Sequence, residues 1–356
     1  RMWLEPLLNL SRSIHYRPWD LKMSIAQLHL VLISFLESVE QTKSLATKAP
    51  SNTASPESYS VQMIRTIPHV GEPFTQGLEV TGDGKYLIET SGSYPVGTDS
   101  FVRLVNPTTG ETIRSWKDGL NGKFAEGIVQ LPQNGHWFVS TYMDKQVIEY
   151  DANLHYVADH DFRWMGWGLT RSADGTSFLA TNGSEFLMKL RPNTFEAMET
   201  KEVTCFGKKV SGLNELEMVD NFMNQGPTLL GNVYLTRLVL AVDPETARCR
   251  GVFHLESLGG KQSDEDAGFH VANGLAYNKT SGNLFVTGKN WKDMFEVRLS
   301  PDPDNVASLM LSDKLVEALP ASFKAMRMEV SPDADSFLHA SPRPLASQRL
   351  VKLETA

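Results

Sequence analysis

Four polar side chains stand at the centre of short apolar segments that recur along the chain. They are Gln76 in Phe-Thr-Gln-Gly-Leu, Glu126 in Phe-Ala-Glu-Gly-Ile, Asn214 in Leu-Asn-Glu-Leu-Glu and Asn273 in Ala-Asn-Gly-Leu-Ala. Amide groups bind polar ligands by hydrogen bonds, and a carboxyl group can transfer a proton. If the segments are equivalent strands around one axis, these groups converge on one site. A channel plugged by buried amides and water is the simpler alternative.

Glu126 is the most informative of the four, because it lies two residues after Phe124 in an apolar segment. Burial raises the pKa of a carboxyl group, and a raised pKa suits proton transfer near neutral pH. Lys289 follows another apolar segment, Leu-Phe-Val-Thr-Gly. Its ammonium group could reach the same place, although an ordinary exposed lysine is the alternative reading.

Other catalytic signatures are missing from the sequence. It contains no H-E-x-x-H, G-x-S-x-G or Walker motif, and no G-x-G-x-x-G between a strand and a helix. His155 and His160 are five residues apart, which suits neither a helix face nor a strand face, so we expect surface histidines there. Cys205 has no nearby histidine to activate it. Its pairing with Cys249 in a disulfide remains open.

The segments that must position these residues form a repeat between residue 59 and about residue 312. Each unit has an apolar first segment with a polar or glycine centre, a turn, a second β-type segment such as His136-Trp-Phe-Val-Ser-Thr, and a third. The third segment often ends in a turn of the type D/N-P-x-T, as in Val-Asn-Pro-Thr-Thr-Gly from Val105. The units open at the following residues: Phe74, Phe124, Gly166, Leu213 and Ala272.

The spacing of the units predicts an all-β fold, a five-bladed β-propeller. The first two units are 50 residues apart and the others roughly 40 to 60, and four strands in such a length make one blade. A pair of β-sandwiches is the rival arrangement, but it needs no repeated first strand. We expect residues 61–67 to close the ring as an outer strand of the last blade.

The composition limits the partners and the type of scaffold. The 356-residue chain has 34 Lys and Arg against 42 Asp and Glu, a formal net charge of −8, which argues against nucleic acid as a partner. Two cysteines exclude a disulfide-built scaffold and a cysteine-rich zinc module.

The two ends of the chain differ from the repeats. Residues 1–58 are predicted to be a leader and linker, with an apolar run at 25–36 that is too short to span a bilayer. Its length and the basic residues before it favour a secretory signal segment near 23–40, and hence the secretory pathway. A surface amphipathic helix is the alternative. Residues 59–312 form the propeller in this prediction, and 313–356 a C-terminal extension with no assigned structure.

The repeats resemble a known family, the plant- and bacterial-type glutaminyl-peptide cyclotransferases. The resemblance runs in order over about 230 residues and rests on eight segments: His69-Val-Gly-Glu-Pro-Phe-Thr-Gln-Gly-Leu-Glu, Gly92-Ser-Tyr, Phe124-Ala-Glu-Gly-Ile, Gly166-Trp-Gly-Leu-Thr, Leu213-Asn-Glu-Leu-Glu, Gly231-Asn-Val-Tyr, Asn273-Gly-Leu-Ala-Tyr and Thr287-Gly-Lys-Asn-Trp. It implies a five-bladed propeller that converts N-terminal glutaminyl residues to pyroglutamyl residues and releases ammonia. It implies no catalytic metal, unlike the unrelated zinc-dependent animal enzymes.

The resemblance also implies a site. Its catalytic groups would be Gln76, Glu126, Asn214 and Lys289, and its substrate-binding residues Phe74, Phe124, Tyr142, Trp167 and Tyr234. Tyrosines stand at positions 142 and 234 where the family usually has tryptophan, so each adds a hydroxyl group that needs a partner.

Partners and alternatives follow from the same resemblance. We expect peptides or proteins with N-terminal glutamine as substrates, no nucleic acid, no stable membrane span and a monomer. No cofactor is expected for catalysis, although some relatives carry a calcium ion in the central channel, so a structural calcium is conceivable. Two other classes stay open, a calcium-dependent lactonase-like propeller and an inactive peptide-binding propeller. The presence of both Glu126 and Lys289 argues against loss of activity.

Overall fold

The computed structural model describes residues 56–93, 99–258 and 270–303, which all belong to one unit, Ser55–Ala356. The predicted leader, signal segment, linker up to residue 55 and C-terminal extension lie outside the described residues. Within those residues the chain is almost entirely β-structure; a short 3-10 helix, η2, covers Phe222–Asn224.

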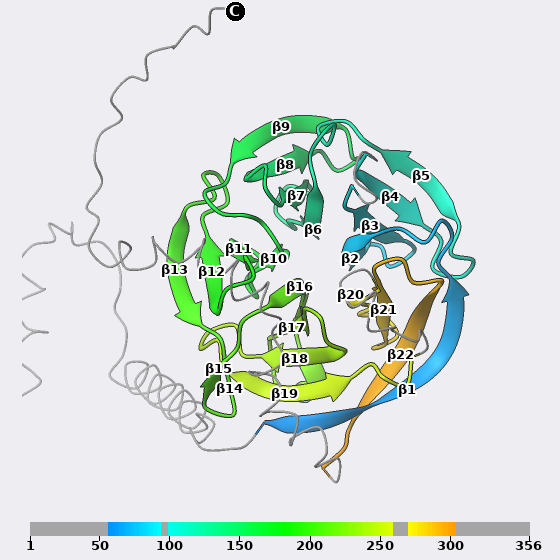
Figure 1. Cartoon of the computed structure of the whole chain (residues 1–356), viewed down its shortest axis with the longest axis vertical. Coiled ribbons are helices and arrows are strands. Elements are labelled where there is room, and N and C mark those ends of the chain that lie inside the picture. Colours follow the sequence, from blue (N-terminus) through cyan, green and yellow to red (C-terminus); the bar gives the residue numbers. More distant parts are fainter. Residues whose placement is uncertain (1–55, 94–98, 259–269, 304–356) are drawn as a thin grey trace, which may run out of the picture. The chain divides into compact units, whose positions relative to one another are not determined.

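Five four-stranded blades surround a common axis, which confirms the predicted five-bladed propeller (Figure 1). Blade 1 contains β2 (Thr75–Val80), β3 (Leu87–Ser91), β4 (Phe101–Val105) and β5 (Thr112–Trp116). Blade 2 contains β6 (Ala125–Gln130), β7 (Trp137–Thr141), β8 (Gln146–Tyr150) and β9 (Tyr156–Asp161). Blade 3 contains β10 (Leu169–Arg171), β11 (Phe178–Ala180), β12 (Phe186–Leu190) and β13 (Ala197–Glu202).

The last two blades are joined into one eight-stranded sheet. Blade 4 contains β16 (Leu213–Val219), β17 (Thr228–Val233), β18 (Leu238–Val242) and β19 (Cys249–His254). Blade 5 contains β20 (Ala272–Tyr277), β21 (Leu284–Gly288), β22 (Asp293–Pro301) and β1 (Glu57–Pro68). A two-stranded hairpin between blades 3 and 4 contains β14 (Thr204–Cys205) and β15 (Lys208–Lys209).

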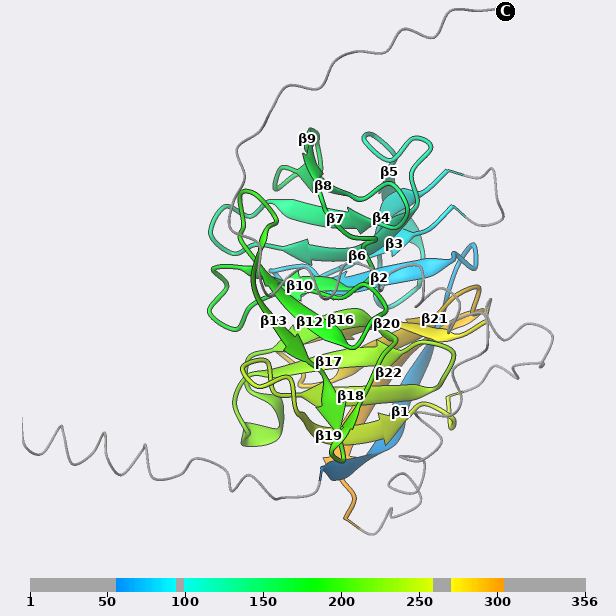
Figure 2. The same ribbon diagram turned by 60° about the vertical axis from the view of Figure 1, so that its left-hand side comes forward.

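The ring closes through β1, which runs antiparallel to β22 as the outer strand of blade 5 (Figures 1 and 2). Val61 pairs with Leu299 and Ile67 with Met294, so the predicted role of residues 61–67 is confirmed. The start of β1 also pairs with β19 in parallel, with Tyr59 opposite Phe253. One strand from the beginning of the described chain therefore joins the last two blades.

Burial changes from the axis to the rim in a way that explains the sequence pattern. Every residue of the inner strand β16 is buried, whereas four of the five residues of the outer strand β5 are exposed. Inner strands are therefore rich in apolar residues, and the polar residues they contain, such as Asn214 and Glu215, are buried, whereas outer strands alternate or are polar. Glycine recurs in the inner strands because these strands approach each other closely: a Cβ at Gly127 would lie 2.4 Å from the backbone nitrogen of Leu169.

The D/N-P-x-T turns have a side-chain cause. The Asn106 Oδ1 atom accepts a hydrogen bond from the backbone N–H of Thr108 at 2.8 Å, between β4 and β5. Asp243 does the same for Glu245 at 2.8 Å, between β18 and β19. Such Asx turns fix the connection between the third and fourth strands of a blade.

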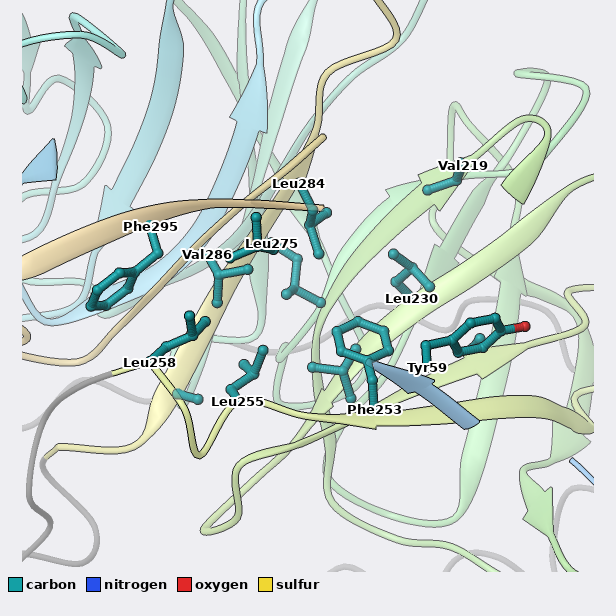
Figure 3. Close-up of a cluster of buried hydrophobic side chains, with 14 of the residues drawn as sticks. Tyr59, Val219, Leu230, Phe253, Leu255, Leu258, Leu275, Leu284, Val286 and Phe295 are labelled. Carbon is teal, nitrogen blue, oxygen red and sulfur yellow. The ribbon is translucent and has the colours of Figure 1, made fainter. Parts of the chain in front are cut away.

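Apolar side chains fill the space between neighbouring blades. The largest cluster lies between blades 4 and 5, around Phe253, Leu275 and Tyr59 (Figure 3). Tyr59 comes from β1, so the closing strand contributes to the core as well as to the sheet. The cysteines also lie in this half of the ring. Cys205 in β14 and Cys249 in β19 form a disulfide, which settles the pairing that the sequence left open.

Three glutamates, of which Glu215 and Glu217 are buried and Glu79 is partly buried, connect inner strands of different blades. The Glu215 carboxylate accepts the backbone N–H of Leu275 at 2.9 Å, Glu217 accepts that of Tyr277 at 2.9 Å, and Glu79 that of Gln130 at 3.0 Å. Burial raises the pKa of each of these carboxyl groups, for Glu217 to about 8. These acids therefore connect neighbouring inner strands around the axis.

No helix among the described residues is long and apolar enough to cross a membrane.

Candidate active site

The nine predicted site residues lie at one end of the propeller axis. Six precede or occupy the start of a first strand: Phe74, Gln76, Phe124, Glu126, Trp167 and Asn214. Three follow the end of a second strand: Tyr142, Tyr234 and Lys289. The first two strands of a blade are antiparallel, so the start of one and the end of the other meet at the same face of the ring.

Aromatic rings form two groups at this face. Phe124 contacts Phe74 and Tyr142 edge-to-face, with ring centroids 6.2 and 6.0 Å apart. Trp167 contacts Tyr234 in the same manner at 5.4 Å. Such edge-to-face contacts stabilise a fixed arrangement of rings.

Lys289 joins the two aromatic groups. Its Nζ atom lies 4.8 Å from the centroid of the Phe74 ring and 5.0 Å from that of Tyr234. These distances are within the range of a cation–π interaction. The five aromatic residues and Lys289 therefore form one continuous set, which we call the aromatic cage.

Glu126 interacts electrostatically with Lys289 of the cage, and both side chains are buried. Burial raises the pKa of Glu126 to about 8, although the Lys289 ammonium partly opposes this. Burial lowers the pKa of Lys289 to about 8, and Glu126 partly opposes that change. A carboxyl group with such a pKa can accept and return a proton near neutral pH.

Two amides complete the predicted set. The Gln76 Nε2 atom lies 3.5 Å from Glu126 Oε1, so its N–H group faces the carboxyl group. Asn214 is buried, and its Oδ1 atom accepts no hydrogen bond from the residues that the structure describes. A buried acceptor of this kind is available to an N–H group of a ligand.

The structure adds a buried network that the sequence prediction missed. Glu89 accepts hydrogen bonds from His69 at 2.9 Å, Thr75 at 2.6 Å and the Arg103 Nε atom at 2.7 Å. Burial alone would raise the pKa of Glu89, but Arg103 and His69 lower it to about 2. Thr75 adjoins Gln76, so the network fixes the strand that presents the Gln76 amide.

The same network connects blade 1 to blade 5. His69 Nδ1 lies 2.8 Å from the backbone oxygen of Trp291, and the Asn290 backbone N–H donates to the oxygen of Pro73. Trp291 and Asn290 directly follow Lys289. The loop with Lys289 and the strand with Gln76 are thus held together where the ring closes. The sequence held only a weak signal, the single charge of Arg103 inside the otherwise apolar segment Phe-Val-Arg-Leu-Val.

Other candidate groups lie away from the cage. His155 pairs with Asp151 at 3.1 Å and His160 with Glu149 at 2.6 Å, in the outer part of blade 2. Both therefore act as local partners of acids. Cys205 is part of the disulfide and carries no free thiol.

A calcium site would need several convergent oxygen ligands. Among the described residues, no group of three or more His, Cys, Asp or Glu side chains is arranged to hold a metal ion. The channel glutamates have raised pKa values and accept backbone N–H groups, which does not suit a cation either. A structural calcium ion stays a prediction, and the proposed reaction does not depend on it.

Comparison with known proteins relates these features to a family. The family model described as glutamine cyclotransferase matches residues 33–299. A glutaminyl-peptide cyclotransferase of Arabidopsis thaliana is 27% identical over 246 residues, which cover 67% of this chain and 71% of that protein. The crystal structure of a glutaminyl cyclase of Myxococcus xanthus is 24% identical and has a TM-score of 0.60. The match covers 70% of this chain and 100% of the Myxococcus chain, and it concerns the fold.

Proposed function

Because the chain belongs to the glutamine cyclotransferase family of enzymes, we propose that it converts N-terminal glutaminyl residues of peptides and proteins to pyroglutamyl residues and releases ammonia. One observation carries the proposal: the buried Glu126 carboxyl group interacts electrostatically with the buried Lys289 ammonium group, which lies against two rings of the aromatic cage. The reaction needs a proton acceptor and a positive group near the reacting amide, and Glu126 and Lys289 can provide them.

The reaction is intramolecular. The free α-amine attacks the carbonyl carbon of the side-chain amide, a C–N bond forms, and the original C–N bond to the amide nitrogen breaks. Attack requires the side chain to fold back on the amine, and holding reactants in such a geometry removes much of the barrier. The rings of Phe74, Phe124 and Trp167 suit the apolar stem of a folded glutaminyl side chain.

Glu126 transfers the proton in this proposal. Its carboxylate takes a proton from the attacking amine and gives it to the departing nitrogen, which leaves as ammonia, so no proton is gained or lost. Lys289 and Gln76 donate hydrogen bonds to the oxygen that becomes negative during attack. Asn214 accepts a hydrogen bond from a substrate N–H group through its Oδ1 atom.

Ammonia release from a dipeptide with N-terminal glutamine tests the proposal. The same dipeptide with an acetylated α-amine is the control, because it has no nucleophile. We expect release from the free dipeptide only. Saturable binding of the free dipeptide without release would instead support the inactive peptide-binding alternative.

Chelators are expected to leave the reaction intact, since the mechanism uses the protein's own groups. Ammonia release should stay within about twofold of the untreated value after dialysis against EDTA. Loss that zinc alone restores would contradict the metal-free mechanism. Loss that calcium alone restores would show a structural ion.

Gly92→Ala should narrow the cage. A Cβ at this position would lie 2.3 Å from the Phe124 Cζ atom, so the ring must move into the space of the substrate. We expect KM to rise about tenfold, since overpacking of this kind costs about 1–3 kcal/mol. Gly82→Ala is the matched control in the same blade, because its Cβ would meet only ordinary contacts, and KM should not change. An unchanged KM in a folded Gly92→Ala protein would mean that Phe124 does not border the substrate.

We also propose that the protein enters the secretory pathway, as the apolar run at residues 25–36 predicts. The Cys205–Cys249 disulfide supports this, because disulfides persist in oxidising compartments. Expression of a tagged full chain followed by fractionation checks it.

A further inference from the structure

A second buried asparagine, Asn273, contacts the Gln76 amide; it is one of the four polar residues of the repeated segments but not one of the nine predicted site residues. Asn273 lies in β20 and is fully buried. Its Nδ2 atom lies 3.0 Å from the backbone oxygen of Thr75 and 3.0 Å from Gln76 Oε1. Gln76 and Asn273 are 197 residues apart in sequence, and they come from blades 1 and 5.

The orientation of both amides follows from the Thr75 carbonyl. A backbone oxygen can only accept a hydrogen bond, so the atom of Asn273 that faces it must be the NH2 group. That NH2 group also faces Gln76, so the atom of Gln76 beside it must be the oxygen. The Gln76 NH2 group therefore points to the other side, where it meets Glu126 Oε1 at 3.5 Å.

We infer that Asn273 is a positioning residue, which fixes the Gln76 amide so that its N–H group, and not its oxygen, faces Glu126. The inference rests on the proposed function in so far as Glu126 transfers the proton. Asn273 Oδ1 has no hydrogen-bond partner among the described residues, so the role depends on the Nδ2 donors.

Loss of these donors should change the ionisation of Glu126. Without them the Gln76 amide can rotate, and its oxygen can turn toward the carboxylate. A donor stabilises a carboxylate and an opposing oxygen destabilises it, so the pKa of Glu126 rises. Lys289 and Tyr234, from the ends of β21 and β17, are the titratable groups that interact with Glu126, and both remain in the variants.

The experiment measures the ionisation midpoint of Glu126 in the free protein. Infrared spectra over a pH series follow its protonated carboxyl band, which is identified by its absence in Glu126→Gln. In Asn273→Ala the midpoint should rise by about half to one pH unit, and kcat at pH 7 should fall about threefold to tenfold. The acidic limb of the kcat/KM profile, which reports groups of the free protein, should move to higher pH by the same amount.

Two comparisons separate positioning from a general structural effect. In a Gln76→Ala background, Asn273→Ala should cause no further rise, because the residue acts through Gln76. Asn283→Ala is the matched control: this buried asparagine of the same blade donates to Glu296 at 2.7 Å, and its loss should leave the midpoint unchanged. Asn273→Ser is the second variant, should Asn273→Ala fail to fold, and its midpoint should move in the same direction.

The outcomes are distinct. A wild-type midpoint in a folded Asn273 variant would overturn the inference, and so would a rise of equal size without Gln76. The midpoint needs no turnover, so it tests Asn273 even in a protein that releases no ammonia. Absence of ammonia release from the wild-type protein would overturn the proposed function alone.

Discussion

Glu126→Gln should lower kcat for a glutaminyl dipeptide by about 10²- to 10⁴-fold, the range that a positioned general base contributes. The substitution keeps the size of the side chain but removes its proton-accepting group. KM should change only a few-fold, because the rings that hold the substrate are unchanged. Initial rates over a range of dipeptide concentrations separate the two constants.

The pH profile gives the sign of the effect. Glu126 must be ionised to accept a proton, so wild-type kcat/KM should rise as pH increases toward the pKa of about 8 in the free protein. That acidic limb should be absent in Glu126→Gln. If the acidic limb persists in Glu126→Gln, the limb arises from the titration of a group other than Glu126.

Glu217→Gln is the matched control for this experiment. Glu217 is also a buried glutamate of an inner strand, and burial raises its pKa to about 8 as well. It accepts the backbone N–H group of Tyr277, which a glutamine oxygen can also do, and it lies three residues further along β16 than the site residue Asn214. We expect kcat close to wild type. Equal losses of kcat in both variants would mean that replacing any buried glutamate near the axis lowers activity by destabilising the fold.

Arg103→Met should destabilise the protein by about 3–5 kcal/mol, since it leaves the buried Glu89 carboxylate without its strongest partner. Arg103 and Glu89 are both almost fully buried and lie 2.6 Å apart. Urea unfolding at pH 7 measures the loss. Arg65→Met is the control, because the Arg65–Glu296 pair is partly exposed and such pairs contribute about 0–1 kcal/mol.

Acid pH should reduce the difference between Arg103→Met and wild type. In the wild-type protein the pKa of Glu89 is lowered to about 2, so its contribution to stability is present above the ordinary pKa of a glutamate and is lost as pH falls toward 2. Without Arg103 the pKa rises, and the carboxyl group becomes neutral on mild acidification. If the loss of unfolding free energy in Arg103→Met does not depend on pH, it arises from changed side-chain packing and not from the charge of Glu89.

The sequence was sufficient for the features that repeat. The recurring first segments predicted the number of blades, and the position of their polar residues predicted that Gln76, Glu126 and Asn214 lie at one end of the axis. The closing role of residues 61–67 followed because a ring of four-stranded blades needs one more outer strand than the last segments provide. These inferences need only local pattern and the symmetry of the fold.

The contacts between side chains could not be predicted in the same way. Glu89 lies opposite Arg103 across two neighbouring strands, but the long connection between β3 and β4 does not fix their register. Without that register the two charges look like ordinary strand residues. The contact of Asn273 with Gln76 depends on closure of the ring, which brings together residues from its first and last blades.

That closure also sets the order in which the protein can be completed. Tyr59 pairs with Pro301, so β1 leaves the ribosome about 240 residues before the strand that receives it. At 5–20 residues per second this is a wait of roughly 10 to 50 s. During most of this time Tyr59 and Ile67, which are buried in the finished ring, face water, because the start of β1 can pair with β19 only about 190 residues later and the rest of β1 only with β22. The interval is a period of exposure to aggregation, and a chaperone bound to residues 57–68 would cover the strand until its partner is made.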